Sequence, residues 1–145
     1  MDVRPLETDR EIGDAYPLMA QLRPHLKQPE FVSVIRHQAA DGYQLFGGFD
    51  DAGRLVALAG LRVAHTLSRG PHLFVDDLVT DESLRGRGYG TAMIRWLRAY
   101  ASEQGLPAVC LDSRDTARGF YERVGFTFHT SIPCRIDSAP AKHGD

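Results

Sequence analysis

The stretch Leu84-Arg85-Gly86-Arg87-Gly88-Tyr89-Gly90-Thr91 combines the residue types that bind an anion at the start of a helix. Its three alternating glycines lack the Cβ atoms that would keep a ligand away from the backbone. The helix expected after it presents unpaired N–H groups and the positive end of the helix dipole. The two arginines add positive charge there. The pattern predicts an anion-binding turn, and a tight turn that merely needs positive φ is the alternative.

Two common nucleotide-binding motifs do not fit this turn. A P-loop requires Gly-Lys-Ser/Thr after its glycines, whereas Gly90 is followed by Thr91 and Ala92. The dinucleotide fingerprint G-x-G-x-x-G would begin at Gly86, but Thr91 occupies the place of its third glycine. The preceding strand also follows a hairpin and does not open a βαβ unit. Both motifs are therefore excluded.

Two adjacent aspartates, Asp76 and Asp77, lie in a stretch that otherwise has the character of a β-strand, Leu73 to Thr80. Aspartate is disfavoured inside strands and costly to bury without a partner. The pair is therefore a candidate for proton transfer. The alternative is that the two carboxylates hold a loop or bind a basic neighbour.

The elements that position these residues follow from hydrophobic spacing and turn signals. A capping box of Thr8 and Glu11 opens a helix to His25, and a second helix runs from Pro29 to Gly42. Apolar residues at helical spacing predict a helix after the glycine turn that ends at Gly105, and a short helix follows at 116–124. Strands are predicted at 43–49, 55–63, 73–80, 108–111, 126–132 and 135–137.

The predicted order of elements is β-α-α-β-β-β-α-β-α-β-β. This order indicates an α/β (α+β) fold with a mixed, mostly antiparallel sheet of six or seven strands flanked by about four helices. The last two strands are expected to form a terminal antiparallel pair. One domain is expected over residues 1–137, and residues 138–145 are expected to form a disordered tail.

Composition limits the classes of function. Of the 145 residues, 43% are hydrophobic and 25% charged, which suits a globular domain, and the formal charge of −2 offers no global attraction to nucleic acid or to an anionic membrane. The two cysteines, Cys110 and Cys134, form no CxxC pair, so we expect free thiols and no metal site. The N-terminal residues have no apolar region typical of a secretory signal, and no apolar stretch is long enough to span a membrane, so we expect a cytoplasmic protein.

The anion-binding turn and a second motif downstream resemble the signatures of the GNAT superfamily of N-acetyltransferases. The coenzyme motif of that family, Arg/Gln-x-x-Gly-x-Gly/Ala, is matched by Arg85, Gly88 and Gly90. Its later signature, Ala-x-x-Phe-Tyr-x-x-x-Gly-Phe, is matched by Ala117, Phe120, Tyr121, Gly125 and Phe126. The resemblance spans roughly Tyr43 to Ser131 at the level of motifs.

The resemblance implies that acetyl-CoA is the cosubstrate. The backbone of Leu78 and Val79, at a bulge in the strand, would pair with the pantetheine arm and polarise the acetyl carbonyl. Where many members carry an asparagine that contacts the coenzyme, this chain departs from the pattern with Arg114, which becomes a candidate coenzyme ligand beside Ser113. The expected coenzyme-binding residues are Leu78, Val79, Thr80, Arg85, Gly86, Arg87, Gly88, Tyr89, Gly90, Thr91 and Arg114.

The implied reaction is direct attack of a primary amine on the thioester in a ternary complex. Because an amine with a pKa of about 10.4 is neutral in only about one molecule in 2,500 at pH 7, a base must take its proton. The resemblance favours Asp76 as that base, through water, with Asp77 as the alternative. It gives Tyr121 the role of general acid toward the leaving thiolate.

Two other functions remain open from the sequence. A non-catalytic acyl-CoA-binding module would keep the anion-binding turn and lack competent chemistry, although Asp76 and Tyr121 together argue against it. A nucleic-acid binder that uses Arg85, Arg87, Arg95 and Arg98 is disfavoured by the net acidic charge. The acceptor, a small molecule or a peptide amine, cannot be read from the residues, and neither can the choice between monomer and homodimer.

Overall fold

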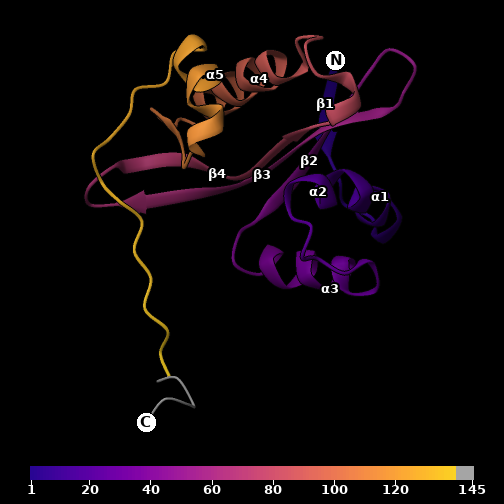
Figure 1. The fold of residues 1–145 in the computed structure, drawn as a ribbon, viewed down its shortest axis with the longest axis horizontal. Helices are drawn as coiled ribbons and strands as arrows, with labels where there is room; N and C mark the ends of the chain where they lie inside the picture. The colour runs from indigo at the N-terminus through magenta and orange to yellow at the C-terminus, as the bar shows by residue number, and fades with distance from the viewer. Residues whose placement is uncertain (140–145) are drawn as a thin grey trace.

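A five-stranded sheet forms the centre of the computed structural model, which describes residues 1–139. The strands follow one another in sequence order, with β1 to β4 antiparallel and β4 parallel to β5 (Figure 1). The strands are β1 (Asp2–Pro5), β2 (Gln44–Phe49), β3 (Leu55–Thr66), β4 (Gly70–Thr80) and β5 (Val109–Leu111). The predicted mixed, mostly antiparallel sheet is therefore confirmed.

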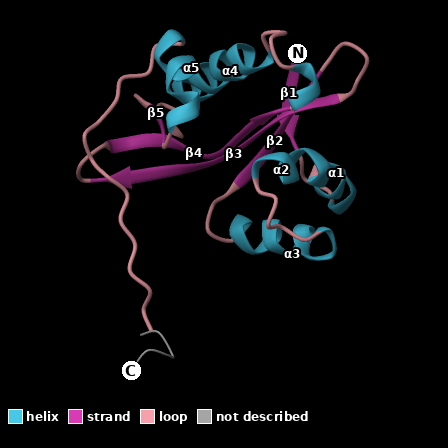
Figure 2. Ribbon diagram, in the orientation of Figure 1, coloured by secondary structure: helices cyan, strands magenta, loops and turns pink. Residues whose placement is uncertain are grey.

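Helices cover both faces of the sheet, each over its own hydrophobic core (Figures 1 and 2). The first face carries α1 (Asp9–Asp14), α2 (Tyr16–Leu22) and α3 (Gln28–Ala39), and the second carries α4 (Tyr89–Glu103) and α5 (Arg118–Arg123). Two 3-10 turns, Glu82–Leu84 and Asp115–Ala117, precede α4 and α5. Residues 56–61 of β3 alternate between the cores, so this part of the strand is buried on both faces.

The first predicted helix is two helices, which raises the number of described helices from about four to five. The predicted capping box is confirmed: the Thr8 side chain accepts a hydrogen bond from the Glu11 amide at 3.1 Å, and the Glu11 carboxylate accepts one from the Thr8 amide at 3.0 Å. The helix ends at Asp14 because Pro17 has no N–H to donate to the preceding turn. Pro17 instead stands in the first turn of α2.

The predicted terminal pair of strands is wrong. Residues 126–139 contain no strand, and after residue 129 the chain runs away from the body of the molecule (Figure 2). The side chains of Ile132 and Ile136 are 80% and 93% exposed. The alternating pattern favours an extended chain, but an extended chain becomes a strand only beside a partner. Of the predicted tail at 138–145, only residues 138 and 139 lie within the described part of the chain.

The helix after the anion-binding turn is confirmed and is the longest of the described helices. Its residues Met93, Ile94 and Leu97 face the second core, where they pack against Leu73 and Val75 of β4. This packing fixes the N-terminus of α4 close to the end of β4. Within residues 1–139, no helix combines the length and the apolar character that crossing a bilayer requires.

Candidate active site

A β-bulge in β4 places the two aspartates on the same side of the sheet. Gly60 of β3 pairs with Asp77, and the next residue, Leu61, pairs with Val75, so Asp76 has no partner on β3. The carboxylates of Asp76 and Asp77 both line one hollow beside α2 and α3. The expected bulge therefore exists, but it lies at Asp76 and not at Leu78 and Val79.

Strands β4 and β5 separate immediately beyond the bulge. Their parallel pairing covers Leu73 to Val75 opposite Val109 to Leu111 and stops there. Residues 76–80 of β4 are half-buried and have no described strand beside them on the β5 side. We call this opening the β4–β5 split. The side chain of Leu78 packs toward the core under α4, and that of Val79 packs toward the core under α2. Because the two side chains point to opposite faces of the sheet, the main chain between them lies along the open edge of β4.

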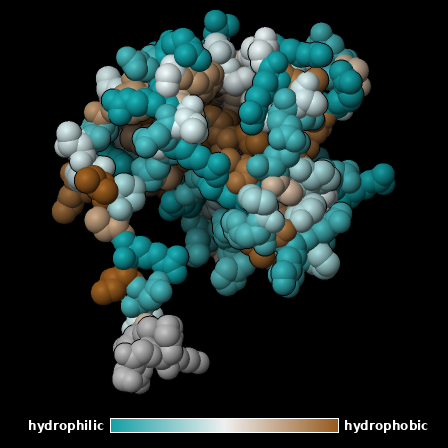
Figure 3. All heavy atoms as spheres, in the orientation of Figure 1, coloured by the Kyte–Doolittle hydropathy of each residue, from teal (hydrophilic) through white to brown (hydrophobic). Residues whose placement is uncertain are grey.

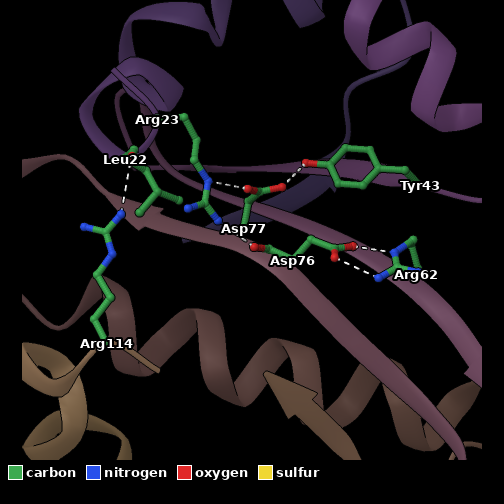
Figure 4. Close-up of polar contacts among 7 residues, drawn as sticks. All are labelled: Leu22, Arg23, Tyr43, Arg62, Asp76, Asp77 and Arg114. Carbon is green, nitrogen blue, oxygen red and sulfur yellow. Dashed lines mark hydrogen bonds and ion pairs between the residues drawn. The ribbon is translucent and has the colours of Figure 1, made fainter. Parts of the chain in front are cut away.

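Asp77 is held by two side chains from distant parts of the sequence (Figure 4). Its Oδ1 accepts a hydrogen bond from Arg23 Nε at 2.9 Å, and its Oδ2 accepts one from the Tyr43 hydroxyl at 2.8 Å. A second nitrogen of Arg23 donates to the main-chain oxygen of Asp76 at 2.9 Å. With 16% of its side chain exposed, Asp77 is part of a packed polar network.

Asp76 is paired with a different arginine. Both of its oxygens accept hydrogen bonds from Arg62, at 2.6 and 2.9 Å, in the bidentate arrangement that suits a guanidinium and a carboxylate (Figure 4). The Asp76 side chain is 27% exposed, more than that of Asp77, and Arg62 is itself half-exposed. Asp76 is therefore the aspartate that a molecule entering the hollow can reach more readily.

The tyrosine in this network depends on a glycine across the sheet. Tyr43 is 4% exposed, and its hydroxyl stands so close to Gly60 that a Cβ at that position would overlap it. A glycine inside a strand often marks such a close approach. Burial, reinforced by the negative charge of Asp77, raises the pKa of Tyr43 far above its usual value. Tyr43 therefore remains a hydrogen-bond donor to Asp77.

The glycine turn before α4 has the positive φ values that both interpretations of this stretch require. Gly86 and Gly88 have φ of 83° and 84°, and Gly88 is the N-cap residue of α4. No side chain caps this helix end, and residues 85–88 are exposed. The first amides of α4 are therefore available to an anion, with Arg85 and Arg87 beside them.

The turn is joined to both β4 and α5. A Cβ on Gly90 would lie 3.9 Å from Thr80 Cγ2 and only 3.2 Å from the Phe120 ring. The absence of that Cβ lets Phe120 pack against the first turn of α4. The adjacent Tyr121 thereby takes a fixed place beside the same helix.

Tyr121 lies in α5 with its ring between two phenylalanines. Its ring centroid is 5.2 Å from that of Phe120 and 5.3 Å from that of Phe126, both edge-to-face. Burial raises the pKa of Tyr121 above its usual value, so the phenol stays protonated at neutral pH. No described contact places Tyr121 within hydrogen-bond distance of Asp76 or Asp77, so the acid and base candidates are separate groups.

Arg114 spans the mouth of the split. Its Nη2 lies 3.3 Å from the main-chain oxygen of Leu22 at the end of α2 (Figure 4). Ser113, the other candidate at this place, donates its hydroxyl to the Arg114 carbonyl at 2.8 Å. The family's asparagine is thus replaced by a longer cation that connects the β5 side to α2.

Two functional candidates, Tyr43 and Arg62, were missed by the sequence analysis, and a third, Arg23, lies in the region expected to bind the acceptor but was given no role. With Asp76 and Asp77 they surround a hollow of about 450 Å³, and Gln38 and Asp41 complete its lining. The sequence holds a signal for Arg62 and for Tyr43. Arg62 is a charged residue within an otherwise apolar strand, and Gly60, a glycine in the same strand, indicates the close approach of another residue, which is Tyr43. Among the described residues, no cluster of His, Cys, Asp or Glu could hold a metal ion.

The chain is similar to known acetyltransferases. The chain matches the model of the Acetyltransferase (GNAT) family over residues 11–126 and therefore belongs to the GNAT family. It is 27% identical over 135 residues to the uncharacterized N-acetyltransferase YhdJ of Bacillus subtilis (strain 168), covering 90% of this chain and 94% of that protein. It is 32% identical over 131 residues to glucosamine 6-phosphate N-acetyltransferase 1 of Oryza sativa subsp. japonica, covering 86% and 79%.

A solved structure agrees with these relatives. The crystal structure of a Trypanosoma brucei acetyltransferase superposes with a TM-score of 0.74 at 28% identity and covers 94% of this chain and 98% of that one. The chain is thus an N-acetyltransferase, an enzyme of the acyltransferase class. The predicted family, fold class and enzymatic activity are confirmed.

Proposed function

We propose that acetyl-CoA binds across the β4–β5 split, with its pyrophosphate on residues 85–91 and its pantetheine arm along residues 78–80. The observation that carries this proposal is the junction of Thr80, Gly90 and Phe120, which joins the open edge of β4 to the free amides of α4. One extended ligand can follow both without a break. Arg85 and Arg87 neutralise the phosphate charge, and Arg114 contacts the coenzyme at the mouth of the split.

The acceptor amine enters on the opposite side, from the hollow beside Asp76 and Asp77. Acetyl-CoA supplies an activated acetyl thioester. Asp76 receives the proton of the amine through water, which requires Arg62 to release one carboxylate oxygen. The main chain at Leu78 and Val79 donates to the developing oxyanion. Tyr121 gives its proton to the departing sulfur, so that the N–C bond forms as the C–S bond breaks, and CoA leaves as a thiol.

The acceptor we propose is a small molecule that carries both a primary amine and an anionic group. The hollow presents the two aspartates to a cation, while Arg23 and Arg62 each retain guanidinium N–H groups beyond those bound to Asp76 and Asp77. Amine and anion can thus be recognised at adjacent points. The rice relative, named for glucosamine 6-phosphate, supports an amino sugar phosphate as the first compound to test.

The test is release of CoA, followed with a thiol reagent, across a panel of amines that includes glucosamine 6-phosphate and glucosamine. We expect the phosphorylated compound to have the higher kcat/KM. Asp76→Asn should lower kcat by roughly 10²–10⁴-fold, as for loss of a general base, and leave coenzyme binding intact. Asp77→Asn should mainly lower stability. Tight CoA binding with no turnover on any amine would contradict the assignment of the acceptor hollow.

A further inference from the structure

Arg62 has one hydrogen-bond partner in the described part of the chain, and that partner is Asp76. Its Nε and Nη2 donate to the two oxygens of Asp76 at 2.6 and 2.9 Å. Both oxygens of the proposed base are therefore engaged as long as this pair is intact. A carboxylate that holds two charge-assisted hydrogen bonds is poorly placed to take a proton from an amine, so Arg62 must move before the base acts.

The second arginine of the hollow, Arg23, is held more firmly. It donates to Oδ1 of Asp77 and to the main-chain oxygen of Asp76, both at 2.9 Å, and thereby ties the end of α2 to the bulge of β4. The side chains of Arg23 and Asp77 are 35% and 16% exposed, against 42% and 27% for the other pair. Of the two ion pairs, that of Arg62 and Asp76 is therefore the more open to a ligand.

The ring of Phe74 gives Arg62 a second contact that does not involve a carboxylate. Arg62 of β3 pairs with Phe74 of β4, and its Cζ lies 5.6 Å from the centre of the Phe74 ring. This distance is within the range of a cation–π interaction. The contact is independent of Asp76, so Arg62 keeps a place at the border of the hollow after it has released the carboxylate.

We propose that the anionic group of the acceptor takes Arg62 away from Asp76, so that the base becomes free only when such an acceptor is bound. This exchange rests on the proposed function, in which Asp76 takes the proton of an amine that also carries an anion. A phosphate monoester has roughly 1.5–2 negative charges at pH 7 and three acceptor oxygens. A carboxylate offers one charge and two oxygens, so the phosphate is the stronger partner for a guanidinium.

The exchange makes Arg62 a specificity-determining residue. An amine without an anion leaves the pair of Arg62 and Asp76 intact and meets an occupied base. A phosphorylated amine binds Arg62 and favours the arrangement in which Asp76 is free. The proton then passes from the amine nitrogen through water to a carboxylate oxygen of Asp76, and the nitrogen lone pair attacks the thioester carbon. The phosphate therefore raises kcat and does not act on KM alone.

The surroundings of the hollow suit a polar acceptor. Helix α3 lies beside it and presents mostly hydrophilic side chains on the face seen in Figure 3. Gln38 and Asp41 in the lining offer hydrogen-bond partners to hydroxyl groups. Apart from the ring of Tyr43, the described lining consists of charged side chains and one amide. An amino sugar phosphate therefore fits this hollow better than an alkyl amine.

The first test compares kcat and KM for glucosamine 6-phosphate and glucosamine at saturating acetyl-CoA. In the wild type, kcat for the phosphorylated amine should be higher by about fivefold or more, the lower end of the usual coupling between two bound groups. In Arg62→Gln, kcat for glucosamine should rise and the two kcat values should become similar, because nothing holds Asp76. A fall of kcat for glucosamine, or an unchanged kcat ratio, would overturn the proposal.

Two further variants complete this test. Arg54→Gln is the matched control, because Arg54 forms a 2.8 Å ion pair with Asp50 in the turn between β2 and β3, outside the lining of the hollow. It should leave both kcat values unchanged. Arg62→Lys keeps the charge but not the bidentate geometry, so its kcat ratio should lie between those of the wild type and Arg62→Gln. Equal changes in Arg54→Gln and Arg62→Gln would overturn the role of Arg62.

The second test observes Arg62 in the wild-type chain without turnover. Its Nε–H signal, assigned through its loss in Arg62→Lys, is followed by NMR during titration with inorganic phosphate at constant ionic strength. We expect a saturable shift with phosphate and none with chloride. This shift, with no turnover on any amine, would support the exchange at Arg62 and contradict the proposed acceptor. No shift, with glucosamine 6-phosphate still acetylated, would overturn the exchange and leave the proposed function standing.

Discussion

The hydroxyl of Tyr43 lies 2.8 Å from Oδ2 of Asp77, and no Cβ fits between that hydroxyl and Gly60. One buried phenol, on the residue that precedes β2, thus contacts β3 and the bulged part of β4. The orientation of Asp77 depends on this contact and on Arg23, and not on the local sequence of β4.

Tyr43→Phe should lower the free energy of unfolding by about 1.5–3 kcal/mol, the usual value of a hydrogen bond to a charged group. Chemical denaturation at pH 7 measures this loss. Tyr100→Phe is the matched control, because it removes an exposed, neutral hydrogen bond of 3.2 Å to Gln44 and should cost less than about 1 kcal/mol. Equal losses in both variants would show that Tyr43 contributes packing alone.

Alkaline pH should destabilise the protein through Tyr43. Burial raises the pKa of Tyr43 in the folded state, whereas the unfolded chain ionises near pH 10. Its contribution to stability is thus complete below about pH 10 and decreases above it, by up to about 1.4 kcal/mol per pH unit. Unfolding of wild type and Tyr43→Phe at pH 8, 10 and 11 should show a shallower decline in the variant. Parallel curves would rule out this origin of the pH dependence.

Gly60→Ala should destabilise the fold by about 1–3 kcal/mol, because the new methyl group displaces the Tyr43 ring. Turnover should change little, because Asp76, the proposed base, keeps its contacts with Arg62. Gly13→Ala, in α1, adds a methyl 3.7 Å from Val32 Cγ2 and should be neutral or stabilising by up to about 1 kcal/mol. Melting curves and CoA release compare the two, and a silent Gly60→Ala would contradict the close approach.

Gly88 and Gly105 have similar backbone conformations, but only Gly88 should affect coenzyme binding. Gly88 and Gly105 have φ of 84° and 73°, and a Cβ at either position meets no other atom within 4 Å. Alanine should cost each about 1–2 kcal/mol of backbone strain. Only Gly88→Ala should weaken CoA binding, by tenfold or more in calorimetry, because Gly105 lies at the other end of α4. Similar affinities for the two variants would remove the anion-binding turn from the site.

Tyr121→Phe tests the general acid. If the phenol protonates the leaving sulfur, kcat should fall by roughly 10²–10⁴-fold, while coenzyme affinity and melting temperature stay near the wild-type values. Since burial raises the pKa of Tyr121, the phenol should keep this role throughout the neutral range. Full turnover in Tyr121→Phe, with an amine that the wild type uses well, would leave Tyr121 a packing residue beside Phe126.

Features of this fold that depend on neighbouring residues were predictable from the sequence. Helix α4 follows from the spacing of Met93, Ile94 and Leu97, and the turn before it from glycines whose φ values are positive. The capping box of α1 is equally local. In each case the residues that decide the structure lie within one or two turns of each other.

Features that depend on distant residues were not predictable. The bulge at Asp76 is a property of the register between β3 and β4, which packing on both faces determines. Arg23 and Tyr43 lie 54 and 34 positions from Asp77 in the sequence, so the residues around that aspartate do not indicate its partners. The pattern after Phe126 indicates an extended chain, but it could not say whether that chain has a partner strand, so the strands predicted there were wrong.

The pairing of each aspartate with its own arginine has a kinetic consequence. A hollow lined by three aspartates and two arginines is nearly balanced in formal charge, so it exerts little long-range pull on a cationic amine. The association rate constants of acceptors should therefore change little with ionic strength. The small net charge of the hollow is already screened beyond a Debye length of about 8 Å at physiological salt. Different amines should therefore differ in their dissociation rate constants and not in their association rate constants.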